Sequence, residues 1–231
     1  MVIYILIYIL TFFLNKDIIC NIYYQSSMTT PVKNLKTGDI LLFSSTFSWT
    51  NLMTWPGKFV EFFTRKQYSH VGMILKDPTW IKPEMTGIYL WESSYEGTPD
   101  PQDDKTKLGV MVTPIEQVLS QHDGRIWVRQ LFDAENKLTI PILKKIHKIV
   151  YEKPYDFNPI DWLSAYLRKN FEKRKESRFF CSALVACIYA ESGIIDTNTN
   201  WTIVRPSDFD ENDTHLTWMG ESHLEGLFQI E

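Results

Sequence analysis

The chain has 231 residues, of which 44% are hydrophobic and 23% are charged, and its net charge at pH 7 is −4. This composition excludes a disordered chain and favours one domain with a sizeable core. The small net charge gives no reason to expect nucleic acid as a partner. Three cysteines without metal-ligand spacing argue against a disulfide scaffold. We expect neither a bound metal nor another cofactor.

An apolar leader opens the chain. Residues 1–14 are almost wholly apolar, a short polar break follows, and residues 18–24 are apolar again. The uninterrupted run is shorter than the roughly 20 residues that span a bilayer. It has the length of a signal peptide but lacks a basic start and a small-residue cleavage site. Three interpretations stay open: a signal or signal-anchor, an extension upstream of a true start at Met28, or a buried strand or helix.

The leader decides the expected location of the protein. If residues 1–24 are a genuine targeting segment, we expect membrane association or a secretory route, and otherwise the cytoplasm. The remainder shows no internal repeat and no Gly- or Ser-rich linker. We therefore divide the chain into a leader, 1–27, and one domain, 28–231.

Strands are predicted mainly in the first half of the domain. A turn runs into a strand at 36–43, and further strands are expected at 69–76, 87–94, 108–113 and 125–131. Prolines predict a loop at 78–86, and polar residues predict a surface loop at 95–107.

Helices are predicted mainly in the second half. They are expected at 49–64 (interrupted at Pro56 and Gly57), after Pro114, and at 140–151, 159–171 and 180–192. Strands followed by helices suggest an α+β fold rather than alternating βα units.

A cysteine stands where the last of these helices should begin. Leu184, Val185, Ile188 and Tyr189 follow Cys181 at helical spacing, which predicts a helix with Cys181 in its first turn on the inward face. The N–H groups of a first turn lack helical partners, and the helix dipole favours a negative charge there. A thiol in this setting has a lowered pKa and acts as a nucleophile. Cys187 is predicted to pack in the core, and Cys20 belongs to the leader.

Two further residues are candidates because of their positions on strands. His70 alternates with Gly72 and Ile74 on one strand face, and the glycine leaves room beside the imidazole for a substrate or a helix end. Glu92 lies among apolar residues of another predicted strand, where a carboxylate needs a partner. If the two strands are neighbours, Glu92 can accept a hydrogen bond from the imidazole and fix its tautomer.

Remaining polar groups carry weaker signals. The basic run at 168–178 is predicted to be a solvated helix end with a loop, with a site for phosphate or anionic headgroups as the alternative. The other histidines show no ligand spacing, which argues against zinc.

The motifs together resemble a known family. They are GDILLF at 38–43, SHVGM at 69–73, LWES at 90–93, KPYDF at 153–157, FCSALV at 180–185 and RPSDF at 205–209. In this order they resemble the circularly permuted branch of the NlpC-type papain-like hydrolases, and within it the YiiX-like group of bacteria, with relatives in large DNA viruses.

The resemblance implies a fold and a set of roles. It implies a permuted papain-like fold, an antiparallel sheet or small barrel packed against helices, with the nucleophile helix near the C-terminus. Cys181 would be the nucleophile, His70 the general base and Glu92 the orienting third member. Backbone N–H groups of Cys181 and Ser182 would stabilise the oxyanion.

The chain differs from the family pattern at two positions, and it has one candidate substrate groove. The group usually has tyrosine before the cysteine and often has glutamate two positions after it, whereas this chain has Phe180 and Ala183. An aromatic segment at 47–63 could line a substrate groove, with Trp49, Phe59 and Tyr68 as candidate binding residues.

The expected function is that of a thiol hydrolase. It would cleave an amide, in a peptide or isopeptide, or a lipid ester, through a thioacyl intermediate; related permuted members include lipid acyltransferases. The alternative is a weakly active or inactive membrane-associated binding protein of the same fold. The sequence predicts no oligomeric state.

Overall fold

The computed structural model describes residues 30–45, 68–155, 178–212 and 214–230. It divides the chain into two compact units, Met1–Asn34 with Glu231, and Leu35–Ile230. The first unit contains one short described helix, α2 (Thr30–Lys33). The predicted leader and the predicted helices at 49–64 and 159–171 lie outside the described residues. All that follows concerns the second unit.

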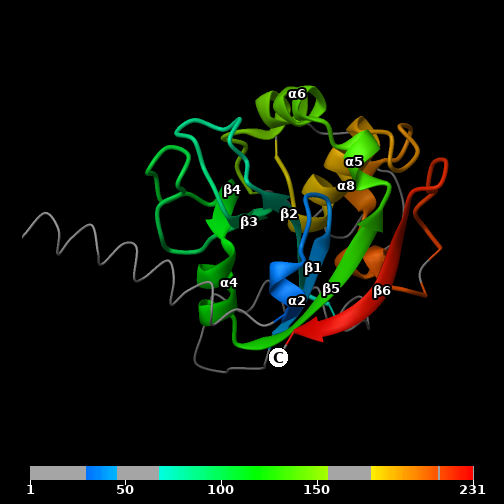
Figure 1. The fold of residues 1–231 in the computed structure, drawn as a ribbon, viewed down its shortest axis with the longest axis horizontal. Helices are drawn as coiled ribbons and strands as arrows, with labels where there is room; N and C mark the ends of the chain where they lie inside the picture. Colours follow the sequence, from blue (N-terminus) through cyan, green and yellow to red (C-terminus); the bar gives the residue numbers. More distant parts are fainter. Residues whose placement is uncertain (1–29, 46–67, 156–177, 213, 231) are drawn as a thin grey trace, which may run out of the picture. The chain divides into compact units, whose positions relative to one another are not determined.

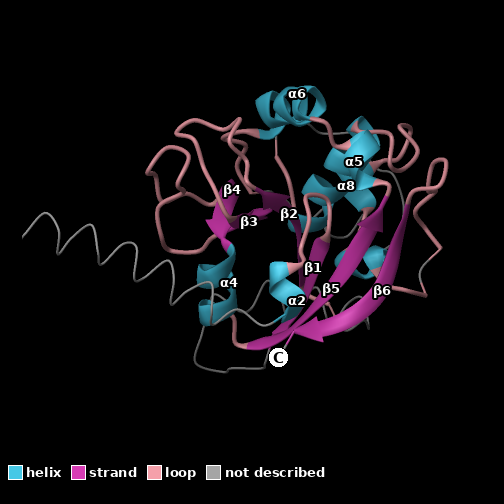
Figure 2. Ribbon diagram, viewed as in Figure 1, coloured by secondary structure: helices cyan, strands magenta, loops and turns pink. Residues whose placement is uncertain are grey.

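A six-stranded antiparallel sheet forms the framework of this unit (Figures 1 and 2). Its strand order is β4-β3-β2-β1-β5-β6, so the first three strands of the chain lie side by side. The strands are β1 (Ile40–Ser45), β2 (His70–Lys76), β3 (Ile88–Ser94), β4 (Gly109–Pro114), β5 (Gly124–Phe132) and β6 (His223–Ile230). Sheet and helices together confirm the predicted α+β class. β4 and β6 are the two edges, so in the described part of the chain the sheet is open and is not a closed barrel.

The last strand, β6, was not expected from the sequence, which predicted only helices late in the chain. Its alternation is broken by Gly226, which has a φ of 52°. The pairing of β5 with β6 shifts register between Val128 and Gln130, which marks a bulge. Because a bulge inserts an extra residue on one side, the period of two that identifies a strand is lost.

Helices cover the sheet. The described ones are α4 (Ile115–Gln121), α5 (Ala134–Lys137), α6 (Ile140–Val150) and α8 (Cys181–Glu191), with the 3-10 turns η2 (Trp201–Ile203) and η3 (Pro206–Phe209). Helix α6 confirms the prediction at 140–151, α4 confirms the helix after Pro114, and the short α5 was not predicted.

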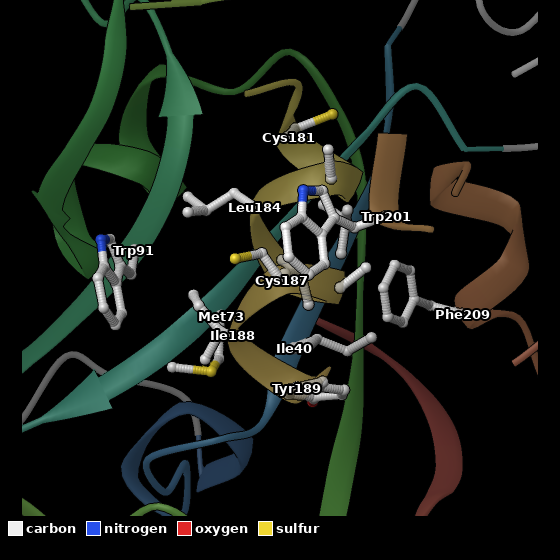
Figure 3. Packing of buried hydrophobic residues seen from close by; sticks show 14 of the residues in the cluster. Ile40, Met73, Trp91, Cys181, Leu184, Cys187, Ile188, Tyr189, Trp201 and Phe209 are labelled. Carbon is white, nitrogen blue, oxygen red and sulfur yellow. The ribbon is translucent and has the colours of Figure 1, made fainter. Parts of the chain in front are cut away.

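Helix α8 is buried on every side, from Cys181 through Ala190. It packs against β2, β3, η2 and α6. The sequence placed Cys181 on an inward face and Cys187 in the core, and the structure buries both, because a helix enclosed by other elements needs no polar face. Figure 3 shows Cys181 at one end of the helix and Tyr189 towards the other, with Trp201 and Phe209 beside it.

The GD pair before β1 ties three elements together. The buried Asp39 carboxylate accepts hydrogen bonds from the N–H groups of Lys36, at 2.8 Å, and of Leu131 in β5, at 3.0 Å. The hydroxyl of Tyr189 in α8 donates to the carbonyl of Gly38 at 2.6 Å. The sequence motif at 38–43 thus joins the start of β1 to both β5 and the far end of α8.

The polar loop at 95–107 has a buried anchor that the sequence did not indicate. The Asp100 side chain is fully buried and lies 2.8 Å from the Lys107 ammonium group. It also accepts a hydrogen bond from the Gln102 amide at 3.0 Å, and Gln102 Oε1 lies 2.6 Å from Nε2 of His147 in α6. A buried charge needs a partner, and Lys107 supplies it for Asp100. The contact of Gln102 with His147 holds the loop against α6.

Gly72 in β2 supplies the room for a core side chain of β3. A Cβ atom at this position would lie 2.7 Å from both Cγ and Cδ1 of Leu90. The space beside Gly72, predicted for a substrate or a helix end, is therefore filled by Leu90.

Gly72→Ala should consequently overpack the core and lower the free energy of unfolding by about 1–3 kcal/mol. Urea unfolding measures this loss. The double variant Gly72→Ala with Leu90→Ala should lose less than the sum of the two single losses, because the shorter side chain removes the clash. Strict additivity would contradict the assigned contact.

Candidate active site

The site forms where β2 and β3 separate. Their pairing runs from Lys76↔Ile88 to Met73↔Trp91 and then ends, whereas β3 stays paired with β4 as far as Ser94↔Gly109. At this opening the backbone N–H of Val71 hydrogen-bonds to the Cys181 thiolate instead of to a strand. The start of α8 thus takes the place of strand pairing beside the first residues of β2.

His70 and Glu92 meet on one face of the sheet. Nε2 of His70 lies 2.8 Å from Oε2 of Glu92. The Glu92 side chain is 3% exposed and the imidazole 23%, so the ring is the more accessible partner. The imidazole also hydrogen-bonds to the thiol of Cys181. With Nε2 turned towards Glu92, Nδ1 is the nitrogen left for the sulfur. The structure therefore brings together the three residues singled out in the sequence.

Electrostatics favour an ion pair between sulfur and imidazole. Burial raises the pKa of the Cys181 thiol, but the His70 charge and the N–H groups of Val71 and Ser182 outweigh burial and lower this pKa below its ordinary value. Burial lowers the pKa of His70, but Cys181 and Glu92 outweigh it and raise this pKa well above its ordinary value. The lowered pKa of Cys181 and the raised pKa of His70 both favour the thiolate–imidazolium pair over the neutral pair.

The start of α8 is held from two sides. Ser93 of β3 donates its hydroxyl to the carbonyl of Phe179 at 2.8 Å, and Ser182 donates to the carbonyl of Val204 at 2.7 Å. The N-cap residue, Phe180, has no polar side chain, so the N–H groups of the first turn are left to stabilise negative charge. The helix end is thus both fixed in place and electropositive.

Two polar residues beside the triad escaped the sequence analysis. Thr113 of β4 donates its hydroxyl to Oε1 of Glu92 at 2.5 Å. Glu96, just after β3, interacts electrostatically with both Glu92 and His70, and accepts a hydrogen bond from Ser94 at 2.7 Å. Alternation in the strand at 108–113 could have placed Thr113 on one face, but nothing in the sequence indicated which strand lies beside β3.

The proposed substrate groove has one member among the described residues. Tyr68 is 2% exposed; its hydroxyl donates to Asp210 at 3.2 Å, and its ring contacts Trp127 edge to face. Its phenol thus ties the start of β2 to the segment after η3. Trp49 and Phe59 lie outside the described residues.

The two departures from the family pattern are both in the core. Phe180 is 8% exposed and its ring packs edge to face against Tyr155, and Ala183 is 2% exposed. Cys187 is fully buried within α8, in the packing position that its spacing predicts. Cys20 and most of the basic run at 168–178 lie outside the described residues.

Metal and membrane features were sought in the same part of the chain. No group of three or more His, Cys, Asp or Glu side chains among the described residues is arranged to hold a metal ion. No described helix combines the length and apolar character required to cross a bilayer.

A cysteine at a helix start, a histidine on a strand and a carboxylate on the neighbouring strand define the class of papain-like thiol hydrolases. Residues 34–227 match the family described as permuted papain-like amidase enzyme, YaeF/YiiX, C92 family, and the chain belongs to this family. The permutation agrees with the chain order, in which the histidine strand precedes the cysteine helix. No curated protein matches the chain.

The ion pair predicts how the thiol titrates. Alkylation of Cys181 should stay fast well below pH 8.5, near which an ordinary thiol loses its proton, because the thiolate persists down to the lowered pKa. In His70→Ala the stabilising charge is gone while burial remains, so the profile should move to higher pH. The measurement is the alkylation rate against pH.

The second cysteine provides the control for this titration. Cys187→Ala should keep the wild-type profile, and Cys181→Ala should remove the fast reaction. An unchanged profile in His70→Ala would show that the imidazole does not stabilise the thiolate.

Proposed function

We propose that the protein is a cysteine amidase that cleaves a peptide or isopeptide bond through Cys181, His70 and Glu92. The observation that carries this proposal is the position of the His70 imidazole, which lies 2.8 Å from the Glu92 carboxylate and hydrogen-bonds to the Cys181 thiol. A nucleophile, a base and a group that orients the base are the parts that acyl transfer requires.

The reaction would proceed in two halves. The Cys181 thiolate attacks the amide carbonyl, and the carbon–nitrogen bond breaks as the imidazolium of His70 gives its proton to the leaving amine. A thioester with Cys181 remains. Neutral His70 then takes a proton from water, whose oxygen attacks the thioester and releases the acid, and the proton kept by the imidazole restores the ion pair.

The first turn of α8 would hold the oxyanion. In this proposal the N–H groups of Cys181 and Ser182 donate to the negative oxygen of each tetrahedral intermediate. The absence of a polar side chain on Phe180 supports this role, because the N-cap residue does not compete for these donors. Removing one such donor typically raises the barrier by about 3 kcal/mol.

Peptide-type amides are favoured as substrates over lipid esters because the family is one of amidases. The aromatic segment at 47–63, which would form an acyl groove, lies outside the described residues and gives no support to a lipid. A binding protein without turnover was suggested by Phe180 and Ala183. Both side chains are core residues, and neither replaces a member of the triad.

Turnover by matched variants tests the proposal. Wild type, Cys181→Ala and Cys187→Ala are compared on a peptide amide library and, in parallel, on lipid esters. Cys181→Ala should lose at least about 10³-fold in kcat/KM for the amides, because no other group supplies the nucleophile. Cys187→Ala should retain wild-type turnover.

The other outcomes separate the alternatives. Equal amide turnover by wild type and Cys181→Ala would exclude this nucleophile. Ester hydrolysis without amide hydrolysis would overturn the amidase assignment in favour of a lipid substrate. A reactive thiol without turnover of either substrate would favour the binding protein.

A further inference from the structure

The Glu92 carboxylate has a second partner besides His70. Thr113 Oγ1 lies 2.5 Å from Oε1 of Glu92, while Nε2 of His70 lies 2.8 Å from Oε2. The Thr113 side chain is buried, 1% exposed, and Glu92 is 2% exposed. Both carboxylate oxygens are therefore occupied by protein groups from the two strands that flank β3.

The two hydrogen bonds at Glu92 fit a carboxylate that accepts from both partners. An ionised carboxylate only accepts hydrogen bonds, so both Thr113 and His70 donate to it. A separation of 2.5 Å falls in the range of hydroxyl donors to charged carboxylates. A hydroxyl that donates to the charged form favours that form over the protonated one.

A second carboxyl, that of Glu96, interacts electrostatically with Glu92. Burial and the charge of Glu92 raise the pKa of Glu96, against the opposing effects of Ser94 and His70. Glu96 receives a hydrogen bond from Ser94, whereas Glu92 has two partners, Thr113 and His70. Burial and the neighbouring charge thus raise the pKa of Glu96, which has fewer hydrogen-bond donors among the described residues than Glu92.

The charged neighbours of this pair come from several elements. His70 faces Glu92 from β2, and Cys181 of α8 lies beyond the imidazole. Glu96 follows β3, and His122 at the end of α4 interacts electrostatically with His70. Thr113 is the neutral donor within this set, so it stabilises the Glu92 charge without adding a proton equilibrium of its own.

We propose that Thr113 is a positioning residue for the reaction: its hydroxyl holds the Glu92 carboxylate in place, so that Glu92 holds the His70 imidazole in line with Cys181. This inference rests on the proposed function. Thr113 does not touch the reacting atoms and acts only through Glu92. Without the hydroxyl, the Glu92 carboxylate loses one of its two partners and holds the imidazolium less firmly, so the thiolate also loses support.

Two substitutions of Thr113 separate the hydroxyl from its packing. Thr113→Val keeps the volume and removes the donor, whereas Thr113→Ser keeps the donor and removes a methyl group. Thr98→Val is the control, because it removes a threonine hydroxyl that accepts a hydrogen bond from Gln117, at 2.5 Å, rather than one that donates to Glu92. Thr113→Ala replaces the valine variant if the latter does not fold.

The readouts are the pH profiles of amide kcat/KM and of Cys181 alkylation. Thr113→Val should lose about 10-fold in kcat/KM. The acid limb of both profiles should move to higher pH by about one unit. Thr113→Ser and Thr98→Val should remain close to wild type. In a Glu92→Gln background, Thr113→Val should have little further effect, because the group that it serves has lost its charge.

Each result decides the proposal. Wild-type profiles in folded Thr113→Val would overturn it, and so would equal losses in Thr113→Val and Thr113→Ser, which would assign Thr113 to packing. If wild type itself shows no amide turnover, the proposed function fails, but the alkylation profile still tests whether Thr113 acts on the ion pair.

Discussion

The separation of β2 from β3 is the constraint on which the site depends. Beyond Met73 and Trp91 the two strands stop pairing, and the N–H of Val71 turns to the sulfur of α8. A continuous ladder would have used that N–H group and closed the space in which the helix begins. The sheet therefore gives up strand hydrogen bonds at one corner, and the helix N-terminus replaces them there.

The carboxylate and the serine hydroxyls of this corner have hydrogen-bond partners. Glu92 receives hydrogen bonds from two neighbouring strands, and Ser93 and Ser182 fix the backbone on either side of Cys181. Polar groups buried without partners would destabilise the fold, whereas these contacts join the sheet to α8. Packing and chemistry consequently use the same residues, and a change at the site also affects the core.

Sequence reasoning succeeded where one residue carried its own signal. His70 and Glu92 were visible as polar residues on apolar strands, and Cys181 stood at the head of a helical pattern. The order of motifs also led to the family, which the match over residues 34–227 confirmed. That Cys181, His70 and Glu92 catalyse a reaction stays a prediction.

Sequence reasoning failed where the role of a residue depended on which strands and helices become neighbours. Thr113 became visible only after β4 was placed beside β3, because alternation gives the face of a strand but not its partner. The period that would identify β6 was lost at the bulge opposite Val128 and Gln130. Polar residues also predicted a surface loop at 95–107, and tertiary packing buried its Asp100.

The complete burial of α8 has a consequence for the accessibility of the reactive pair. The helix is enclosed along its length, and its far end is tied to Gly38 through Tyr189. The sulfur, on a residue only 5% exposed, is thus rigidly mounted, while the neighbouring imidazole is 23% exposed. Among the described residues, the imidazole is thus the more open side of the reactive pair, and the sulfur is the more enclosed one.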